Sequence, residues 1–299
     1  MRSFLLLTLP LLLAAPPAQP EPVEMLVSAP GATLSVTFAT EVDTATSRDI
    51  IEWLDHVADQ VSQPYGRFPI EAPRIVVIPT QARPWGGDSP VPFGRVTRRG
   101  GEAIELYVDV SRPIEDMYAD WTATHEFSHL LLPRISWRQK WISEGFASYY
   151  QNVLMARAGR YTPEEGIRKL SEGFGRGRGS RPGLSPNGAA EEGVRRARYK
   201  IYWSGAAIAL LADLRLRERS DGKESLDTVL GRFQECCLPS QKRWSGTELF
   251  ARFDSLIDEP VFMPLYREFA DTPGFPDTTE ALSNPLVREQ IFRVRTYPN

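Results

Sequence analysis

Two histidines one helical turn apart are the feature that most constrains this 299-residue chain. Residues 125–129 read His-Glu-Phe-Ser-His, and Glu144 follows within the stretch Trp-Ile-Ser-Glu-Gly-Phe-Ala-Ser. On a helix, His125 and His129 project from one face and can share a metal ion, whereas Glu126 points about 100° away. The chain has only three histidines, and two of them fall in this motif, which argues against a chance pattern.

The spacing predicts a zinc site with three protein ligands. A hydrolytic zinc site needs a third ligand besides the two histidines, and an open position for water. Glu144 is the expected third ligand, because a turn over residues 133–139 lets a second helix return antiparallel to the first. Glu126 is then expected to act as general base on the water. The predicted site therefore holds one zinc ion, with ligands His125, His129 and Glu144.

The N-terminus has the pattern of a secretory signal peptide. Residues 1–3 carry a positive charge, residues 4–13 are mostly apolar, and small residues and prolines follow. We expect residues 1–19 to be removed on export to the periplasm or out of the cell. A retained membrane anchor is the alternative, although the apolar run is too short to span a bilayer. After cleavage, no other segment is expected to insert stably into a membrane.

The amino-acid composition excludes few classes of protein. With 42% hydrophobic and 24% charged residues, the chain has ample material for a core, and its net charge of −3 gives no argument for a nucleic-acid partner. The only cysteines are the adjacent Cys236 and Cys237. Two partly buried thiols on a helix are the simpler interpretation, and a vicinal disulfide is the alternative.

Strand patterns lie early in the chain and helical patterns later. Residues 20–115 are expected to form a strand-containing lobe, and residues 116–299 a helical lobe that carries the histidines. The expected strands are residues 34–38, 74–79 and 104–108. The expected helices are residues 47–61, 117–132, 140–158, 196–219, 226–235, 247–257 and 261–269. Ser47 is a possible N-cap of the first of these helices, and His56 on it is expected to be a surface or hydrogen-bonded histidine rather than a ligand. Residues 173–188 are rich in glycine and arginine and are expected to form a long loop, either a lid or an insertion.

The stretches around the histidines and Glu144 resemble the gluzincin metallopeptidases, especially the aminopeptidase N and glycyl aminopeptidase families. The similarity extends to Tyr202-Trp-Ser-Gly and the apolar run after it, and covers about residues 120–232. It implies an α+β zincin fold of the thermolysin-like type. In such a fold a small mixed sheet forms one lobe, helices form the other, and zinc lies in the cleft between them.

The same resemblance assigns a role to Tyr202, because these families use a tyrosine at this position to assist the transition state. Ser204 stands where the families usually have a lysine. The Gly-x-Met-Glu-Asn segment that binds a substrate's free amine in aminopeptidase N is absent. Glu102 and Glu105 lie near the expected place, although the surrounding residues match poorly. The choice between endo- and exopeptidase action therefore stays open.

Three functions are compatible with the sequence. The leading hypothesis is a zinc metallopeptidase that acts on a peptide or protein substrate, with Glu126 as base and the Tyr202 hydroxyl as oxyanion donor. The alternatives are an inactive zinc-binding module and a metallohydrolase with a non-peptide substrate. Ser148 is a candidate to support a histidine ligand, or else a helix-packing serine. Residues 104–108 could offer a sheet edge to a peptide, or lie inside the sheet.

Overall fold

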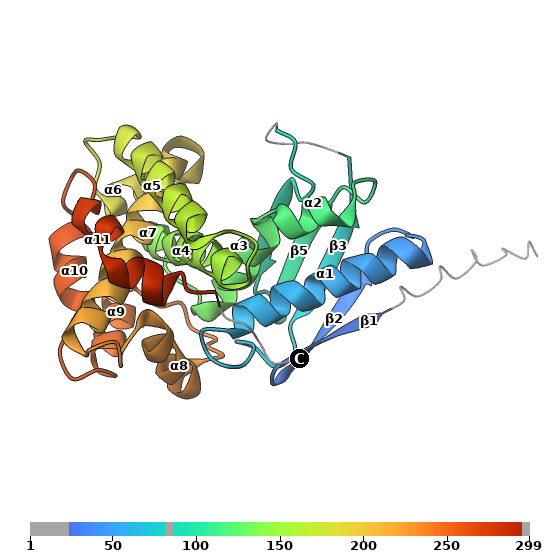
Figure 1. The fold of residues 1–299 in the computed structure, drawn as a ribbon, viewed down its shortest axis with the longest axis horizontal. Coiled ribbons are helices and arrows are strands. Elements are labelled where there is room, and N and C mark those ends of the chain that lie inside the picture. The colour runs from blue at the N-terminus through green and yellow to red at the C-terminus, as the bar shows by residue number, and fades with distance from the viewer. Residues whose placement is uncertain (1–23, 82–86, 295–299) are drawn as a thin grey trace, which may run out of the picture.

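A sheet and one long helix occupy the first third of the chain, and helices occupy the rest (Figure 1). The computed structural model describes residues 24–81 and 87–294, so the expected signal peptide at residues 1–19 lies outside the described residues. Within these ranges, none of the helices combines the length and the apolar character that crossing a membrane requires.

The five strands form one mixed sheet with the order β1-β2-β3-β5-β4. Strands β2, β3 and β5 run parallel, and β1 and β4 pair antiparallel at the two edges. The strands are β1 (Met25–Ala29), β2 (Ala32–Phe38), β3 (Arg74–Pro79), β4 (Phe93–Thr97) and β5 (Ala103–Val108). The central strands bury one face more fully than the other; on the buried face Val36 pairs with Ile75, and Ile75 with Ile104, all fully buried.

Of the two interpretations of residues 104–108, the interior strand is correct, since β5 lies between β3 and β4. The edge strand is β4, which the sequence pattern does not predict. Its register places Gly94 opposite Leu106 and Arg95 opposite Glu105. This edge faces the helix that carries the histidines.

Helix α1 (Thr44–Ser62) packs on the sheet through its apolar face (Figure 1). The expected cap at Ser47 is wrong. Asp43 caps the helix instead, and its carboxylate accepts hydrogen bonds of 3.0 Å from the backbone N–H groups of Ala45 and Thr46. The buried face consists of Ile50, Trp53, Leu54, Val57, Ala58 and Val61.

The helical part runs from α2 to the end of the described chain. Its α-helices are α2 (Ile114–Ala119), α3 (Thr122–Ser128), α4 (Lys140–Arg157), α5 (Pro163–Gly179), α6 (Pro186–Glu192), α7 (Val194–Arg219), α8 (Leu226–Cys237), α9 (Gly246–Asp254), α10 (Phe262–Phe269) and α11 (Thr279–Ser283). Short turns of other helix types are η1 (His129–Leu131), η2 (Trp137–Gln139) and η3 (Val287–Ile291). Most of the larger helical body lies on the far side of α3 from the sheet (Figure 1).

Two sequence predictions fail in this part. The helix expected over residues 117–132 is interrupted at Asp120, which is extended and whose carboxylate accepts a 2.7 Å hydrogen bond from the Thr122 N–H. The loop expected over residues 173–188 is mostly helix, since α5 continues to Gly179 and α6 begins at Pro186. Gly173 and Gly177 occur inside α5 because a Cβ at either position would overlap the Trp203 side chain.

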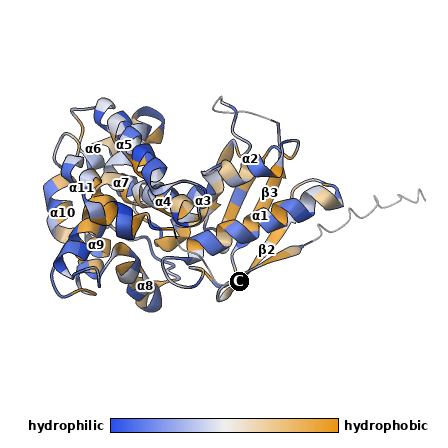
Figure 2. Cartoon of the chain, viewed as in Figure 1, coloured by the Kyte–Doolittle hydropathy of each residue, from blue (hydrophilic) through white to orange (hydrophobic). Residues whose placement is uncertain are grey.

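Helices α4 and α7 form the centre of the helical body and are buried over most of their length. Figure 2 shows hydrophobic residues along the sheet strands, whereas the helices carry both hydrophobic and hydrophilic residues. Helix α8 ends at the two cysteines, whose sulfurs form a vicinal disulfide rather than two free thiols. The vicinal disulfide, which was the alternative interpretation of this pair, is therefore correct, and the interpretation as two thiols is wrong.

Candidate active site

The two histidines and Glu144 come from two consecutive helical segments. His125 lies in α3, His129 begins the short turn η1, and Glu144 lies one turn into α4. The chain reverses over residues 133–139, as the spacing predicts, and brings Glu144 back to the histidines. All three side chains are largely buried, with Glu144 and His125 only 4% and 3% exposed.

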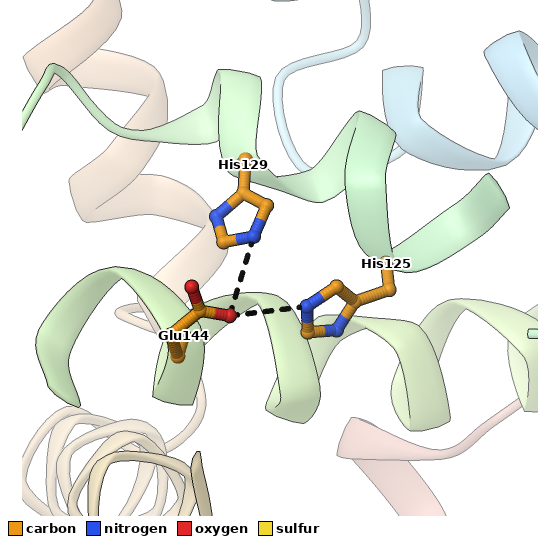
Figure 3. A group of neighbouring side chains, drawn as sticks. All are labelled: His125, His129 and Glu144. Atoms are coloured by element: carbon orange, nitrogen blue, oxygen red, sulfur yellow. Dashed lines mark hydrogen bonds and ion pairs between the residues drawn. The ribbon is translucent and has the colours of Figure 1, made fainter. Parts of the chain in front are cut away.

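The three side chains converge on one point (Figure 3). Oε2 of Glu144 lies 3.4 Å from Nε2 of His125 and 3.5 Å from Nε2 of His129. One ligand atom from each residue lies within 4.8 Å of the others. Two imidazole nitrogens and one carboxylate oxygen form a donor set that zinc accepts. The residues predicted as ligands are thus the ones that the fold brings together.

Each histidine also makes a hydrogen bond through Nδ1, the ring nitrogen that does not face Glu144. Nδ1 of His125 lies 2.7 Å from Oε1 of Gln151, and Nδ1 of His129 lies 3.0 Å from Oγ of Ser143. An Nδ1–H that donates to a fixed partner sets the tautomer and leaves the Nε2 lone pair free to face a metal. The sequence pattern did not indicate that Gln151 and Ser143 contact the histidines, although Ser143 directly precedes Glu144. Ser148, the candidate for this role, makes neither contact; its carbonyl accepts a hydrogen bond from Asn152.

Glu144 also has a cationic neighbour. Nζ of Lys140, one turn earlier in α4, lies 2.9 Å from Oε1 of Glu144, the oxygen that does not face the histidines. Burial raises the pKa of Glu144, but the charges and hydrogen bonds of the histidines together with Lys140 outweigh it and hold the pKa well below its usual value. Glu144 is therefore a carboxylate, as a metal ligand must be.

Glu126 lies beside the histidines and under the edge strand. A Cβ added to Gly94 of β4 would come within 2.5 Å of Cγ and 3.2 Å of Cδ of Glu126, so glycine allows the strand to approach this side chain closely. Burial raises the pKa of Glu126, while the nearby charges of His129 and His125 oppose that shift. The carboxylate is thus close to both histidines without being part of the converging group.

Tyr202 of α7 lies on the other side of His125. The two rings stack with their centroids 5.7 Å apart and their planes 3° from parallel. Burial, followed by the charges of Glu144 and Glu126, raises the pKa of Tyr202 well above its usual value, so the hydroxyl stays protonated and can donate a hydrogen bond. The neighbouring Ser204 is fully buried, and its hydroxyl has no hydrogen-bond partner among the described residues.

The two glutamates considered as amine-binding candidates are engaged elsewhere. Glu102 forms a 3.3 Å ion pair with Arg98, which also donates to the carbonyls of His129 and Leu132 at 2.8 and 2.9 Å. Glu105 forms a 2.6 Å ion pair with Arg95. Both carboxylates are therefore neutralised by arginines, and Arg98 ties the loop after β4 to the end of the histidine-bearing segment.

Comparisons with known proteins agree with this geometry. The sequence model of the M61 glycyl aminopeptidase family matches residues 133–205, a stretch that contains Glu144 and Tyr202 but begins after His129. This chain resembles the gluzincin peptidases. The match covers about a quarter of the sequence and leaves the sheet outside it. No curated protein sequence matches the chain significantly.

The similarity to solved structures extends beyond the matched segment. An aminopeptidase N family protein from Idiomarina loihiensis aligns over 87% of this chain and 48% of its own length, at 14% identity and a TM-score of 0.66. An M1 zinc metallopeptidase from Deinococcus radiodurans aligns over 88% of this chain and 54% of its own, at 16% identity and a TM-score of 0.56. This chain thus spans about half the length of the structures that it matches, and the likeness concerns the α+β fold.

Proposed function

We propose that the protein is a zinc-dependent metallopeptidase of the gluzincin type. One observation carries the proposal: Nε2 of His125, Nε2 of His129 and a carboxylate oxygen of Glu144 meet within 4.8 Å. The M61 family match and the zinc metallopeptidases among the similar structures support it. The proposal includes the thermolysin-like arrangement, with one zinc ion between the sheet-bearing lobe at residues 20–115 and the helical lobe at residues 116–299.

The residues present fit zinc. His125, His129 and Glu144 would hold the ion, and the hydrogen bonds at Gln151 and Ser143 orient both imidazoles for it. A fixed set of three protein ligands leaves a fourth position open, as hydrolytic sites require. When bound, zinc would lower the pKa of a water molecule and polarise the carbonyl of the scissile bond.

The chain's own side chains would carry the proton transfers. Glu126 takes a proton from the attacking water and passes it to the nitrogen of the leaving amine as the C–N bond breaks. The Tyr202 hydroxyl donates a hydrogen bond to the oxygen on which negative charge develops. The low exposure of the site strengthens both interactions, because fewer water molecules screen the charges.

The test compares the wild-type protein with Glu126→Gln. We expect about one zinc per chain in both, and hydrolysis of a peptide mixture by the wild type alone. Zinc binding without hydrolysis by the wild type would favour the inactive binding module, or a hydrolase with a non-peptide substrate. Glu105→Gln is a matched control, since Glu105 lies on β5 in an ion pair with Arg95 and its loss should leave hydrolysis unchanged.

The proposal also includes the cellular location of the protein. The pattern of residues 1–19 supports export to the periplasm or out of the cell, with the peptidase released after signal cleavage. Fractionation of cells that produce the full chain, together with N-terminal sequencing of the mature protein, tests this. A mature chain that still begins at Met1 would contradict signal cleavage.

A further inference from the structure

With a zinc ion bound, the charged groups around the histidines and Glu144 would carry a net positive charge. Glu126 and Glu144 would together offset the two charges of a zinc ion, and Lys140 adds a third positive charge at 2.9 Å from Glu144. Two other carboxylates on the sheet side, Glu102 and Glu105, are paired with Arg98 and Arg95.

Lys140 is placed so that it can meet a second partner. The Lys140 side chain is 46% exposed, whereas that of Glu144 is 5% exposed, so part of Lys140 stays accessible to a substrate while its ammonium group contacts the buried carboxylate. An ammonium group has three N–H donors, and Oε1 of Glu144 needs only one of them. The cation therefore directly adjoins Glu144, a proposed zinc ligand, and so borders the proposed zinc position.

A second cation borders the site on the side of α7. Arg198 lies one turn before Tyr202, is exposed, and is close enough for its charge to lower the tyrosine's pKa against the effect of burial. Its guanidinium group stacks on the exposed Tyr199 ring at 4.9 Å. An approaching substrate thus meets positive charge from both α4 and α7, a field that favours anionic groups.

We propose that Lys140 is a specificity-determining residue, and that the site takes peptides with a carboxylate next to the scissile bond. The inference rests on the proposed peptidase function and adds the substrate class. A contact between a partly desolvated ammonium group and a carboxylate is a charge-assisted hydrogen bond, and the neutral amide of the same shape cannot replace it. A free amine at the same position is repelled by Lys140, so the site discriminates against it.

The experiment uses the zinc-loaded protein and N-terminally blocked, internally quenched peptides that differ only by Glu, Gln or Lys beside the scissile bond. We expect the wild type to prefer Glu over Gln by about tenfold or more in kcat/KM, and Lys140→Met to abolish this ratio. The ratio within one enzyme cancels any loss of activity that both peptides share. Lys140→Glu should favour the Lys peptide. Peptides with a free or an amidated C-terminus identify whether the carboxylate belongs to a side chain or to the chain end.

Lys169→Met is the control, because Lys169 also pairs with a glutamate one turn away, Glu165 at 3.8 Å, on α5, a helix without site residues. It should keep the wild-type ratio. Equal cleavage of the Glu and Gln peptides by the wild type, or a ratio that survives Lys140→Met, would overturn the inference.

Binding gives a readout that does not depend on turnover. The Glu126→Gln variant, loaded with zinc, should bind the Glu peptide about tenfold more tightly than the Gln peptide, and Lys140→Met in the same background should remove the difference. If the wild type hydrolyses no peptide but this binding preference is present, the peptidase proposal fails and the carboxylate site stands. If peptides are cut and no preference is found in either assay, only the carboxylate site fails.

Discussion

Gly145 of α4 and Gly205 of α7 meet where the two central helices cross, and a Cβ on Gly145 would overlap the Cα of Gly205. Glu144 directly precedes the first glycine, and Tyr202 lies one turn before the second. The close crossing therefore fixes how far the proposed zinc ligand lies from the proposed oxyanion donor. Backbone meets backbone here, so no side-chain movement can make room for a methyl group.

Gly205→Ala should accordingly destabilise the protein. A Cβ at this position would overlap the carbonyl oxygen of Trp141, and we expect a loss of about 2–3 kcal/mol in the free energy of unfolding, measured by urea denaturation. Gly231→Ala on α8 is the control, because nothing lies within 4 Å of its added Cβ. That change should stabilise the protein by about 0.5–1 kcal/mol. Equal effects of the two substitutions would show that the helix crossing is not tight.

Gln151→Ala should weaken zinc binding while the fold is retained. The Nδ1 atom of His125 would lose its 2.7 Å partner, so the ring would no longer be held with Nε2 toward the metal. We expect the zinc dissociation constant to rise about 10- to 100-fold in a competition assay with a chelator. Gln151→Glu, which retains an acceptor, should restore most of the affinity. An unchanged constant in Gln151→Ala would remove this residue from the site.

The convergence of His125, His129 and Glu144 was predictable because its signal is local. A histidine pair four residues apart needs only a helix to converge, and Glu144 needs only one reversal of the chain. Gln151 and Ser143 could not be assigned in the same way, because which polar residue of α4 reaches which Nδ1 atom depends on the rotation of α4 against α3. The same holds for Lys140, whose significance appears only through its contact with Glu144.

The fold was predictable where one periodicity dominates. The alternation in β2 and the apolar face of α1 match the structure. In α5, glycines and arginines predict a loop, yet the helix forms because Gly173 and Gly177 allow it to pack closely against Trp203 of α7. Tertiary contact overrides local propensity there. The edge strand β4 has only five residues and half-buried side chains, so its sequence carries little period-two signal.

Gly94→Ala should impair turnover more than zinc binding. The added Cβ would come within 2.5 Å of Cγ of Glu126, so either the base or the edge strand must move. We expect kcat to fall about 100-fold, because a displacement of about 1 Å at a catalytic group costs that much. The zinc content should stay near that of the wild type. Loss of zinc in parallel with activity would indicate that the substitution disturbs the ligands rather than the base.

We expect His56 to reduce the free energy of unfolding in acid. Its Nε2 accepts hydrogen bonds from Gln60 at 2.8 Å and Arg160 at 3.0 Å, so the folded protein needs the neutral ring. Burial, and then the charge of Arg160, lowers the pKa of His56 from 6.5 to about 4. The unfolded chain therefore takes up the proton first, and the stabilisation is complete above pH 6.5 and is lost as the pH falls toward 4.

Between pH 7 and pH 5, the wild type should consequently lose about 1 kcal/mol more unfolding free energy than His56→Gln, after allowance for the partial exposure of the ring. Urea denaturation at both pH values measures the difference. The comparison of two proteins removes the contribution of the carboxylates, which both share. Parallel pH profiles would show that His56 is protonated in the folded protein as easily as in the unfolded chain.

Tyr202→Phe separates the role of the hydroxyl from that of the ring. The phenylalanine ring can keep the stack on His125, at 5.7 Å between centroids, and so preserve the packing around the ligand. The hydroxyl's hydrogen bond to Glu144 and the donor to the developing oxyanion are lost, and we expect kcat to fall about 100- to 1,000-fold while KM and zinc content change much less. Steady-state kinetics with metal analysis measures this. A change confined to KM would instead mean that the hydroxyl binds the substrate's ground state and gives the transition state no additional stabilisation.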